Sequence, residues 1–233
     1  MSRPAAPAYA VRGWTLAKAG HTPEENEDAW AASPPGADPL VLAVADGATE
    51  TAFARSWALA LVAAVVETGT VAGAHERARR AHEAAVGAQA ATLPWYAAAK
   101  AEEGAFAALL AVRLTVSGRF EAEAVGDACL FHVRGLALVA AWPFTDADAF
   151  NHRPRLLASN ARAPAPLVTA GQLARGDRLL LATDALAAFF LRDGFGRLDA
   201  LRHEFPTAIA HARRDGLRND DVTLVECGMG EAK

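Results

Sequence analysis

Short apolar runs of strand length alternate along the chain with longer segments of helical period. Residues 8–19 interleave apolar and polar side chains, as in a first strand, and residues 40–45 are apolar throughout, as in a buried strand. Residues 179–182 and 222–227 have the same apolar character near the C-terminal end. These four segments predict strands that bury at least one face.

Helical patterns lie between these strands. Thr49 is the N-cap expected for a helix that continues to about residue 66, and this helix is apolar nearly all round, so we expect it to be buried against a sheet. A second helix is expected over residues 73–91. Further helices are expected over 185–192 and about 197–214.

The middle of the chain is rich in strand patterns with short glycine-containing breaks. Residues 106–116, 120–125, 130–133 and 136–141 are separated by such breaks, which predicts an antiparallel meander. Residues 142–172 contain four prolines and no sustained period, so they indicate a surface loop or flap. The mixed order of elements predicts an α+β fold with helices outside packed sheets, in one domain over residues 1–233.

Composition narrows the class of protein. The 233 residues are 52% hydrophobic and 21% charged, as in an ordinary globular protein. A net charge of −4 provides no general attraction to nucleic acid or to anionic lipid, so neither is an expected partner. The two cysteines, Cys129 and Cys227, lie within apolar runs and are expected to be reduced and buried rather than paired.

No targeting or membrane segment is expected. The N-terminal residues lack the continuous apolar stretch of a signal peptide, and the longest apolar stretch, residues 57–66, is about half of the ~20 residues that a membrane span needs. A cytoplasmic protein is therefore expected.

Carboxylates at the ends of apolar runs carry most of the functional information. Asp46, Asp127, Asp184 and Asp220 each lie at one end of such a run, and Asp221 follows Asp220. A carboxylate at the end of a buried strand is costly unless it is paired or bound to a cation. Converging strand ends would therefore suit hard metal ions with oxygen ligands.

Each carboxylate has an ordinary alternative explanation. Asp46 and Asp127 adjoin glycines and could lie in tight turns, and Asp220 could end a loop. The acidic cluster at residues 24–28 could be a solvated charged segment. Asp184 is the hardest to explain in this way, because it separates a strand pattern from an apolar helical pattern.

The order of the motifs is more specific than any single one. Asn26-Glu27-Asp28, Ala45-Asp46-Gly47, Gly126-Asp127, Thr183-Asp184 and Asp220-Asp221 resemble, in this order, the metal-dependent protein phosphatases of the PP2C (PPM) family in a divergent bacterial form. The resemblance extends from about residue 10 to residue 227. It implies a four-layer α-β-β-α sandwich, with two antiparallel sheets flanked by helices and a two-metal site at one end.

The resemblance also implies roles for individual residues. Glu27, Asp46 and the Gly47 carbonyl would hold one Mg²⁺ or Mn²⁺ ion, and Asp46 would bridge it to a second ion. The other ligands of that second ion would be Asp184 and Asp220. Two further aspartates match family positions close to these ligands: Asp28 would lie directly behind them, and Asp127 would match a weaker third metal position.

The residue types agree with this chemistry. Carboxylates and a carbonyl suit Mg²⁺ or Mn²⁺ rather than zinc, and the sequence has no His/Cys ligand spacing. Two such ions can activate a bridging water for attack on phosphorus, with Asp46 as the shared catalytic ligand. No protein nucleophile is then needed, which fits the lack of a Ser-His-Asp or cysteine-based signature.

The sequence departs from the family pattern at the phosphate-binding position. Family members usually carry an arginine where this chain has Pro23. His21 is the nearest replacement and could donate a hydrogen bond or act as a catalytic acid, although a surface histidine without a role is an equal alternative. Arg12 and Arg55 are other cationic candidates.

Two further departures concern the third metal and the flap. Ala185 and Ala188 replace a glycine and an acidic residue of the family, which predicts a weak or missing third metal. The segment after residue 142 lacks the usual family motif. Within it, His152, Arg153 and Arg155 could contact substrate, although a solvated loop is the simpler interpretation.

Three functions remain open at this point. The first is a metal-dependent phosphatase acting on phosphoserine and phosphothreonine in proteins, with a cognate Ser/Thr kinase as an expected partner. The second is a pseudophosphatase that binds a phosphoprotein or regulatory partner without turnover. The third is a phosphatase of small phosphorylated metabolites. It differs from the first only in its substrate, and the sequence does not decide between the two.

Overall fold

Two antiparallel sheets form the centre of the computed structural model, which describes residues 9–48, 53–90, 104–150 and 154–229. The first sheet has the strand order β1 (Tyr9–Leu16), β11 (Val222–Met229), β10 (Asp177–Ala182), β6 (Cys129–Arg134) and β7 (Ala137–Trp142). The second has the order β2 (Asp28–Ala32), β3 (Leu40–Gly47), β4 (Phe106–Leu114), β5 (Arg119–Val125) and β9 (Leu167–Gln172), and the short β8 (Leu157–Ala158) pairs with β4.

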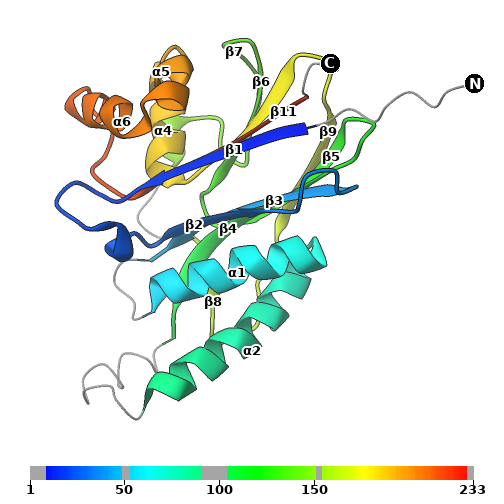
Figure 1. Cartoon of the computed structure of the whole chain (residues 1–233), viewed down its shortest axis with the longest axis vertical. Coiled ribbons are helices and arrows are strands. Elements are labelled where there is room, and N and C mark those ends of the chain that lie inside the picture. Colours follow the sequence, from blue (N-terminus) through cyan, green and yellow to red (C-terminus); the bar gives the residue numbers. More distant parts are fainter. Residues whose placement is uncertain (1–8, 49–52, 91–103, 151–153, 230–233) are drawn as a thin grey trace, which may run out of the picture.

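Helices cover the outer face of each sheet (Figure 1). Helices α1 (Ala54–Thr68) and α2 (Val71–Ala90) pack on the second sheet. Helices α4 (Asp184–Asp193), α5 (Leu198–His203) and α6 (Phe205–Arg214) pack on the first. Two single 3₁₀ turns, η1 (Pro23–Glu25) and η2 (Ala147–Ala149), lie in connections. The predicted sandwich of two antiparallel sheets between helical layers is confirmed.

Alternation along the strands divides the core into three layers. On β3, Leu42 and Val44 face the other sheet, whereas Ala43 and Ala45 face helix α1. On β10, Leu181 faces the other sheet and its neighbours face α4 and α6. Because these strands are buried on both faces, they read as continuous apolar runs.

The predicted meander is wrong at one connection. β4 and β5 form a hairpin in the second sheet, and β6 and β7 form a hairpin in the first. Between them, at Gly126 and Asp127, the chain crosses from one sheet to the other. Gly126 has a φ of +100°, and a Cβ there would lie 2.4 Å from Cβ of Ala108. A glycine is therefore needed at the crossing.

Residues 142–172 are more ordered than the predicted flap. β8 and β9 lie within this segment, and β9 forms the edge of the second sheet beside β5. The prolines do not prevent this, because they precede β9 and an edge strand needs hydrogen bonds on one side only. The segment is therefore partly a structural strand.

The helix boundaries also differ from the predictions. The pattern over residues 197–214 forms two helices, α5 and α6, separated at Glu204, because Pro206 starts a new helix rather than continuing the old one. Thr49 lies outside the described residues, and helix α1 follows Phe53, whose φ is +64°. Cys129 and Cys227 are buried and unpaired, as predicted.

Both sheets end in strands with exposed apolar side chains. β7 and its turn expose Leu136, Leu138 and Val139, and β9 exposes Leu167 and Val168, each with 46–66% of its surface accessible. None of the helices in the described part of the chain combines the length and hydropathy needed to cross a bilayer.

Candidate metal centre

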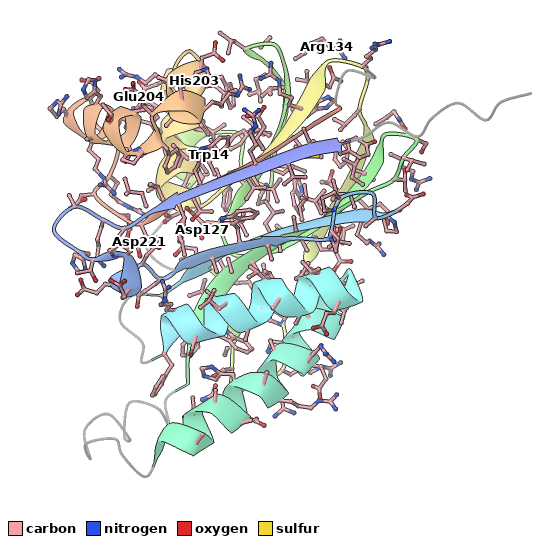
Figure 2. All side chains as sticks on the ribbon, viewed as in Figure 1. Trp14, Asp127, Arg134, His203, Glu204 and Asp221 are labelled. Carbon is pink, nitrogen blue, oxygen red and sulfur yellow. The ribbon has the colours of Figure 1, made fainter. Side chains whose placement is uncertain are left out.

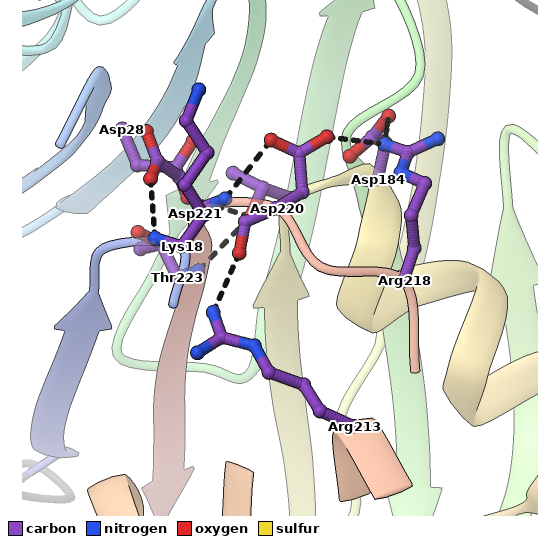
Figure 3. Close-up of polar contacts among 9 residues, drawn as sticks. Lys18, Asp28, Asp184, Arg213, Arg218, Asp220, Asp221 and Thr223 are labelled. Atoms are coloured by element: carbon purple, nitrogen blue, oxygen red, sulfur yellow. Dashed lines mark hydrogen bonds and ion pairs between the residues drawn. The ribbon is translucent and has the colours of Figure 1, made fainter. Parts of the chain in front are cut away.

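The predicted carboxylates come together from both sheets at one end of the sandwich. In the second sheet, Asp28 on β2 is the direct cross-strand partner of Asp46 on β3. In the first sheet, Asp184 begins helix α4 after β10, and Asp220 precedes the neighbouring strand β11. Figure 3 shows Asp184 and Asp220 both in contact with the Arg218 guanidinium, and Asp28 beside Asp221.

Burial and mutual repulsion govern the protonation of these groups. Burial raises the pKa of Asp46 well above its usual range, and neighbouring negative charges raise it further. These charges belong to four other carboxylates: Asp28, Asp184, Asp127 and Asp220. An ionised carboxylate is therefore unfavourable at Asp46 unless a proton or a cation offsets its charge.

Asp127 joins this group from the crossing between the sheets. Its side chain is buried, and burial followed by the charge of Asp184 raises its pKa to about 7, against a smaller opposing effect of Arg218. Figure 2 shows Asp127 and Asp221 in the same part of the molecule, away from Arg134. The glycine-containing break that suggested a hairpin turn instead delivers this carboxylate to the interface of the sheets.

A buried hydrogen bond links the two sheets behind the acidic group. Thr183 Oγ1 donates to Asp28 Oδ2 at 2.8 Å, and the backbone N–H of Thr223 donates to Thr183 Oγ1 at 2.9 Å. The sequence analysis did not identify Thr183. Its signal was a hydroxyl directly before Asp184, at the end of an otherwise apolar strand.

Asp221 fixes the loop that carries Glu27. Its carboxylate accepts hydrogen bonds from the backbone N–H of Lys18 at 2.8 Å and of Glu27 at 2.7 Å. Nearby, Asn26 Nδ2 donates to Thr15 Oγ1 at 2.8 Å, and its Oδ1 accepts from the Asp28 N–H at 2.9 Å. These bonds tie the chain before β2 to strands of the first sheet.

Close backbone packing joins Glu27 to Gly47. The Gly47 N–H donates to the Glu27 carbonyl at 3.3 Å, and a Cβ on Gly47 would lie 2.9 Å from that carbonyl oxygen. A larger residue would push the two segments apart. Glycine is therefore required at position 47 for this close approach of the Glu27 backbone.

Two arginines from the segment before β11 contact the acidic group. Arg218 Nη2 is bonded to Asp184 Oδ2 and lies 3.0 Å from Asp220 Oδ2. Arg213 Nη2 donates to the backbone carbonyls of Asp220 at 2.7 Å and Ala17 at 3.1 Å (Figure 3). The sequence analysis missed both arginines, although Arg218 lies only two positions before Asp220.

The oxygen donors gathered here suit a divalent cation, although they do not form a ready-made cage. Within the described ranges, no three acidic or histidine side chains lie in a ready-made metal-binding arrangement. Asp28 Oδ1 is nevertheless buried without a hydrogen-bond partner, and all the gathered groups are oxygen donors. A buried, unpartnered carboxylate oxygen beside other carboxylates fits a hard cation such as Mg²⁺ or Mn²⁺.

Comparison with known proteins identifies the family of the chain. The profile described as protein phosphatase 2C matches residues 18–222. The chain belongs to the protein phosphatase 2C family. The predicted enzyme class, a PP2C-type protein phosphatase, is thereby confirmed at the level of the family. A comparison with curated proteins finds no match.

Solved PP2C-type structures share the fold at low sequence identity. The Mycobacterium tuberculosis serine/threonine phosphatase PstP/Ppp is 22% identical, with a TM-score of 0.63 over 96% of this chain and 100% of that one. The PstP catalytic domain in complex with two manganese ions is 21% identical, with a TM-score of 0.61 over 95% and 98% of the two chains. RsbX in complex with magnesium is 16% identical, with a TM-score of 0.55 over 96% of each chain.

The PP2C position that usually carries arginine is filled differently here. Pro23 lies in the exposed turn η1, but the guanidinium of Arg55 reaches the same turn from helix α1. Arg55 Nη1 donates to the carbonyl oxygens of Asn26 at 2.5 Å and of Pro23 at 3.2 Å. A cavity of about 410 Å³ is lined by these residues together with His21 and Asp28.

His21 lies at the exposed mouth of this cavity. Its Nδ1 is 3.7 Å from Glu25 Oε1, and 39% of its side chain is accessible. Arg12 is exposed on β1 and does not line the cavity. Among the cationic candidates from the sequence, Arg55 therefore has the best-defined position.

A second cavity adjoins Asp127. It has a volume of about 280 Å³ and is lined by Asp127, Phe144, Arg155 and Leu167 among others.

Ala185 is buried at the start of α4 and Ala188 lies one turn further on, so neither offers an oxygen ligand from its side chain. His152 and Arg153 lie outside the described residues.

Proposed function

We propose that this chain is a metal-dependent phosphatase that hydrolyses phosphoserine and phosphothreonine in proteins. The observation that carries the proposal is the meeting of Asp46 from one sheet with Asp184 and Asp220 from the other. Membership of the PP2C family supports the same reaction class. The proposal treats residues 1–233 as one cytoplasmic PP2C-like domain, with phosphoproteins from a Ser/Thr kinase as substrates.

The proposed ligand set follows the grouping of the carboxylates. Glu27, Asp46 and the Gly47 carbonyl would hold one Mg²⁺ or Mn²⁺, and Asp46, Asp184 and Asp220 the other. When bound at these residues, the metal pair would supply a nucleophilic water at neutral pH and charge neutralisation for the phosphoryl oxygens. Asp127 would serve only a weaker third position.

The remaining residues hold this arrangement and the substrate. Thr183 fixes Asp28 behind the ligands, and Asp221 holds the backbone of Glu27. Arg55 would bind the substrate phosphoryl group from the cavity it shares with His21, because a guanidinium presents paired donors to phosphate. His21 would donate a proton or a hydrogen bond to the leaving oxygen.

A pseudophosphatase is the second candidate. Two observations favour it: Pro23 stands at the usual arginine position, and Arg218 occupies carboxylates that a metal would need. Such a protein would bind a phosphoprotein through Arg55 without turning it over.

Turnover separates the two candidates. In Mn²⁺, we expect the wild type to hydrolyse a phosphothreonine peptide, and we expect Asp46→Asn and Asp184→Asn each to lower kcat/KM at least about 100-fold, because each removes a charged metal ligand. The measurement is phosphate release from the peptide, with p-nitrophenyl phosphate as a small-molecule comparison.

Asp193→Asn provides the matched control. Asp193 is exposed at the end of helix α4 and pairs only with Arg192 among the described residues, so its removal should leave kcat/KM unchanged. Activity that survives both site variants would reject the ligand assignment. Mn²⁺ binding without hydrolysis of any phosphorylated substrate would favour the pseudophosphatase.

A further inference from the structure

We propose that Arg218 is a built-in counter-cation that occupies the place of one metal ion, so that a divalent cation must displace its guanidinium in order to bind. The inference rests on the proposed ligand set and extends it to a residue outside that set. It concerns metal affinity and the stability of the metal-free protein rather than the hydrolytic step.

One nitrogen atom of Arg218 contacts both carboxylates. Arg218 Nη2 is bonded to Asp184 Oδ2 and is 3.0 Å from Asp220 Oδ2. Asp184 and Asp220 are proposed ligands of the same ion. A single positive group therefore contacts both of the carboxylates that are proposed to hold this ion.

Backbone hydrogen bonds fix the turn that carries both Arg218 and Asp220. The Asp220 N–H donates to the Arg218 carbonyl at 3.0 Å, so the two residues are held in one tight turn. Arg213 anchors the same turn through the Asp220 carbonyl at 2.7 Å. The arginine and one of its carboxylate partners are thus presented together.

The burial of the partners distinguishes this contact from an ordinary surface ion pair. The Asp184 side chain is only 15% accessible and that of Asp220 34%, whereas Arg218 is 48% accessible. Exposed pairs such as Arg197–Asp215 contribute little to stability. Arg218 instead reaches from solvent to carboxylates that lie close to three others.

The consequence is a competition between one guanidinium and one divalent ion. Without metal, Arg218 partly neutralises Asp184 and Asp220 and so stabilises the fold. With metal, the same two carboxylates change partner, and the ion pair must be broken. Arg218 should therefore stabilise the metal-free protein and weaken metal binding.

The test is Mn²⁺ titration by calorimetry on the full chain, together with thermal unfolding in EDTA and in excess Mn²⁺. We expect Arg218→Gln to bind Mn²⁺ about tenfold more tightly than the wild type, because no ion pair has to be broken and no neighbouring positive charge repels the ion. In EDTA the variant should unfold at a lower temperature than the wild type, and its gain in Tm on adding Mn²⁺ should be larger.

Two further variants keep the result decisive. Arg197→Gln removes an arginine whose ion pair with Asp215 lies away from the acidic group, so its Mn²⁺ affinity should match the wild type. Arg218→Lys keeps the positive charge on a different head group. Its Mn²⁺ affinity should lie between those of the wild type and Arg218→Gln. It replaces Arg218→Gln in the test if that variant does not fold.

The outcomes separate this inference from the proposed function. Equal or weaker Mn²⁺ binding by Arg218→Gln, with wild-type binding intact, overturns the role of Arg218 and leaves the phosphatase proposal standing. Binding by neither protein at millimolar Mn²⁺ overturns both. Binding by Arg218→Gln alone supports the competition and shows that the wild-type chain does not take up the ion.

Discussion

Arg55 lies at the beginning of helix α1, and its guanidinium is held over the turn η1 by the carbonyl oxygens of Asn26 and Pro23. Backbone carbonyls of a loop thus position a side chain from a distant helix. The arrangement places a cation beside Pro23, a residue that cannot itself contribute one.

Replacement of Arg55 should affect substrate binding more than the hydrolytic step. For Arg55→Gln we expect kcat/KM for a phosphothreonine peptide to fall about tenfold, mainly through KM, because a charge-assisted hydrogen bond to phosphate is lost. The inhibition constant of inorganic phosphate should rise in parallel. Steady-state kinetics and phosphate inhibition measure both.

Arg12→Gln is the control, since Arg12 is exposed on β1 and does not line the cavity with His21. An unchanged phosphate inhibition constant in Arg55→Gln would contradict the assignment. In that case His21→Gln would be the next variant to measure.

Single residues differed in how well the sequence revealed them. Asp184 and Asp46 could be identified because a charge at the end of an apolar run is visible locally. Thr183 could not, because its partner Asp28 is 155 positions away and on the other sheet. Arg218 was missed for a related reason: nothing local shows that an arginine will face the carboxylates instead of solvent.

Strands β6 and β10 are joined by a polar network at the end of β10 remote from Asp184. Asp177 begins β10 and is fully buried, and it accepts hydrogen bonds from Arg134 Nε and from the Ala174 N–H at 2.7 and 2.9 Å. His132 Nε2 lies 2.7 Å from Asp177 Oδ2. The Arg134 guanidinium is the main cause of an Asp177 pKa well below the usual range, with the Ala174 N–H and His132 lowering it further against the opposing effect of burial.

A lowered carboxyl pKa gives a definite pH dependence. The stabilising effect of Asp177 is present above the pKa of the unfolded chain, about 3.9, and is lost as the pH falls through the lower pKa of the folded state. Asp177→Asn should therefore lower the free energy of unfolding by about 2 kcal/mol at pH 7. This loss is smaller than for a fully buried ion pair, because Arg134 is exposed. The difference in free energy from the wild type should shrink below about pH 4.

Chemical unfolding of both proteins across this pH range makes the comparison. Asp199→Asn removes an exposed carboxylate, and its partner Arg202 on α5 keeps its ion pair with Glu226, so this change should cost less than about 0.5 kcal/mol at every pH. A difference between Asp177→Asn and the wild type that grows as the pH falls would have the wrong sign for this network.

Elements were predictable where their period was regular. β3 and β10 were identified because burial on both faces leaves an uninterrupted apolar run, and the run of β11 is interrupted only by Thr223 and Glu226 before Cys227. The crossing at Gly126 was not, because glycine followed by aspartate has the same local chemistry in a hairpin turn and in a change of sheet. β9 was obscured by the prolines before it, since an edge strand gives a weak pattern.

The two sheets are joined through polar groups as well as through the apolar layer between them. Asp28 belongs to one sheet, and Thr183 ends a strand of the other, so their hydrogen bond crosses the sandwich beside the acidic group. Figure 1 shows these two layers lying face to face, with helices outside each.

Loss of this bond should destabilise the whole molecule. Thr183→Val removes the donor to Asp28 and the acceptor of the Thr223 N–H, and we expect a loss of about 2 kcal/mol, or a Tm lower by about 4–8 °C. Differential scanning calorimetry in EDTA provides the measurement.

Thr68→Val is the matched control, because Thr68 is exposed and bonds to the Ala64 carbonyl of its own helix. Its Tm should change by no more than about 2 °C. An equal decrease in Tm for the two substitutions would show that the hydrogen bond between Thr183 and Asp28 stabilises the molecule no more than an exposed hydrogen bond within a helix.

At the scale of the whole molecule, the sequence pattern alone predicted layered α+β packing, and the family resemblance supplied the four layers. The pairing of strands far apart in the chain, such as β1 with β11, has no local signal. It depends on which apolar faces can be buried together, and that is decided only when all layers are present.

The uncovered apolar side chains of β7 and β9 bear on how the protein behaves in a test tube. Each strand borders a sheet, and the described residues of β7 include no charge that would repel another strand. Unpaired peptide groups beside Leu138, Val139 and Val168 favour self-association as the protein is concentrated. Kinetic and calorimetric comparisons among variants are therefore best made at matched, dilute concentrations.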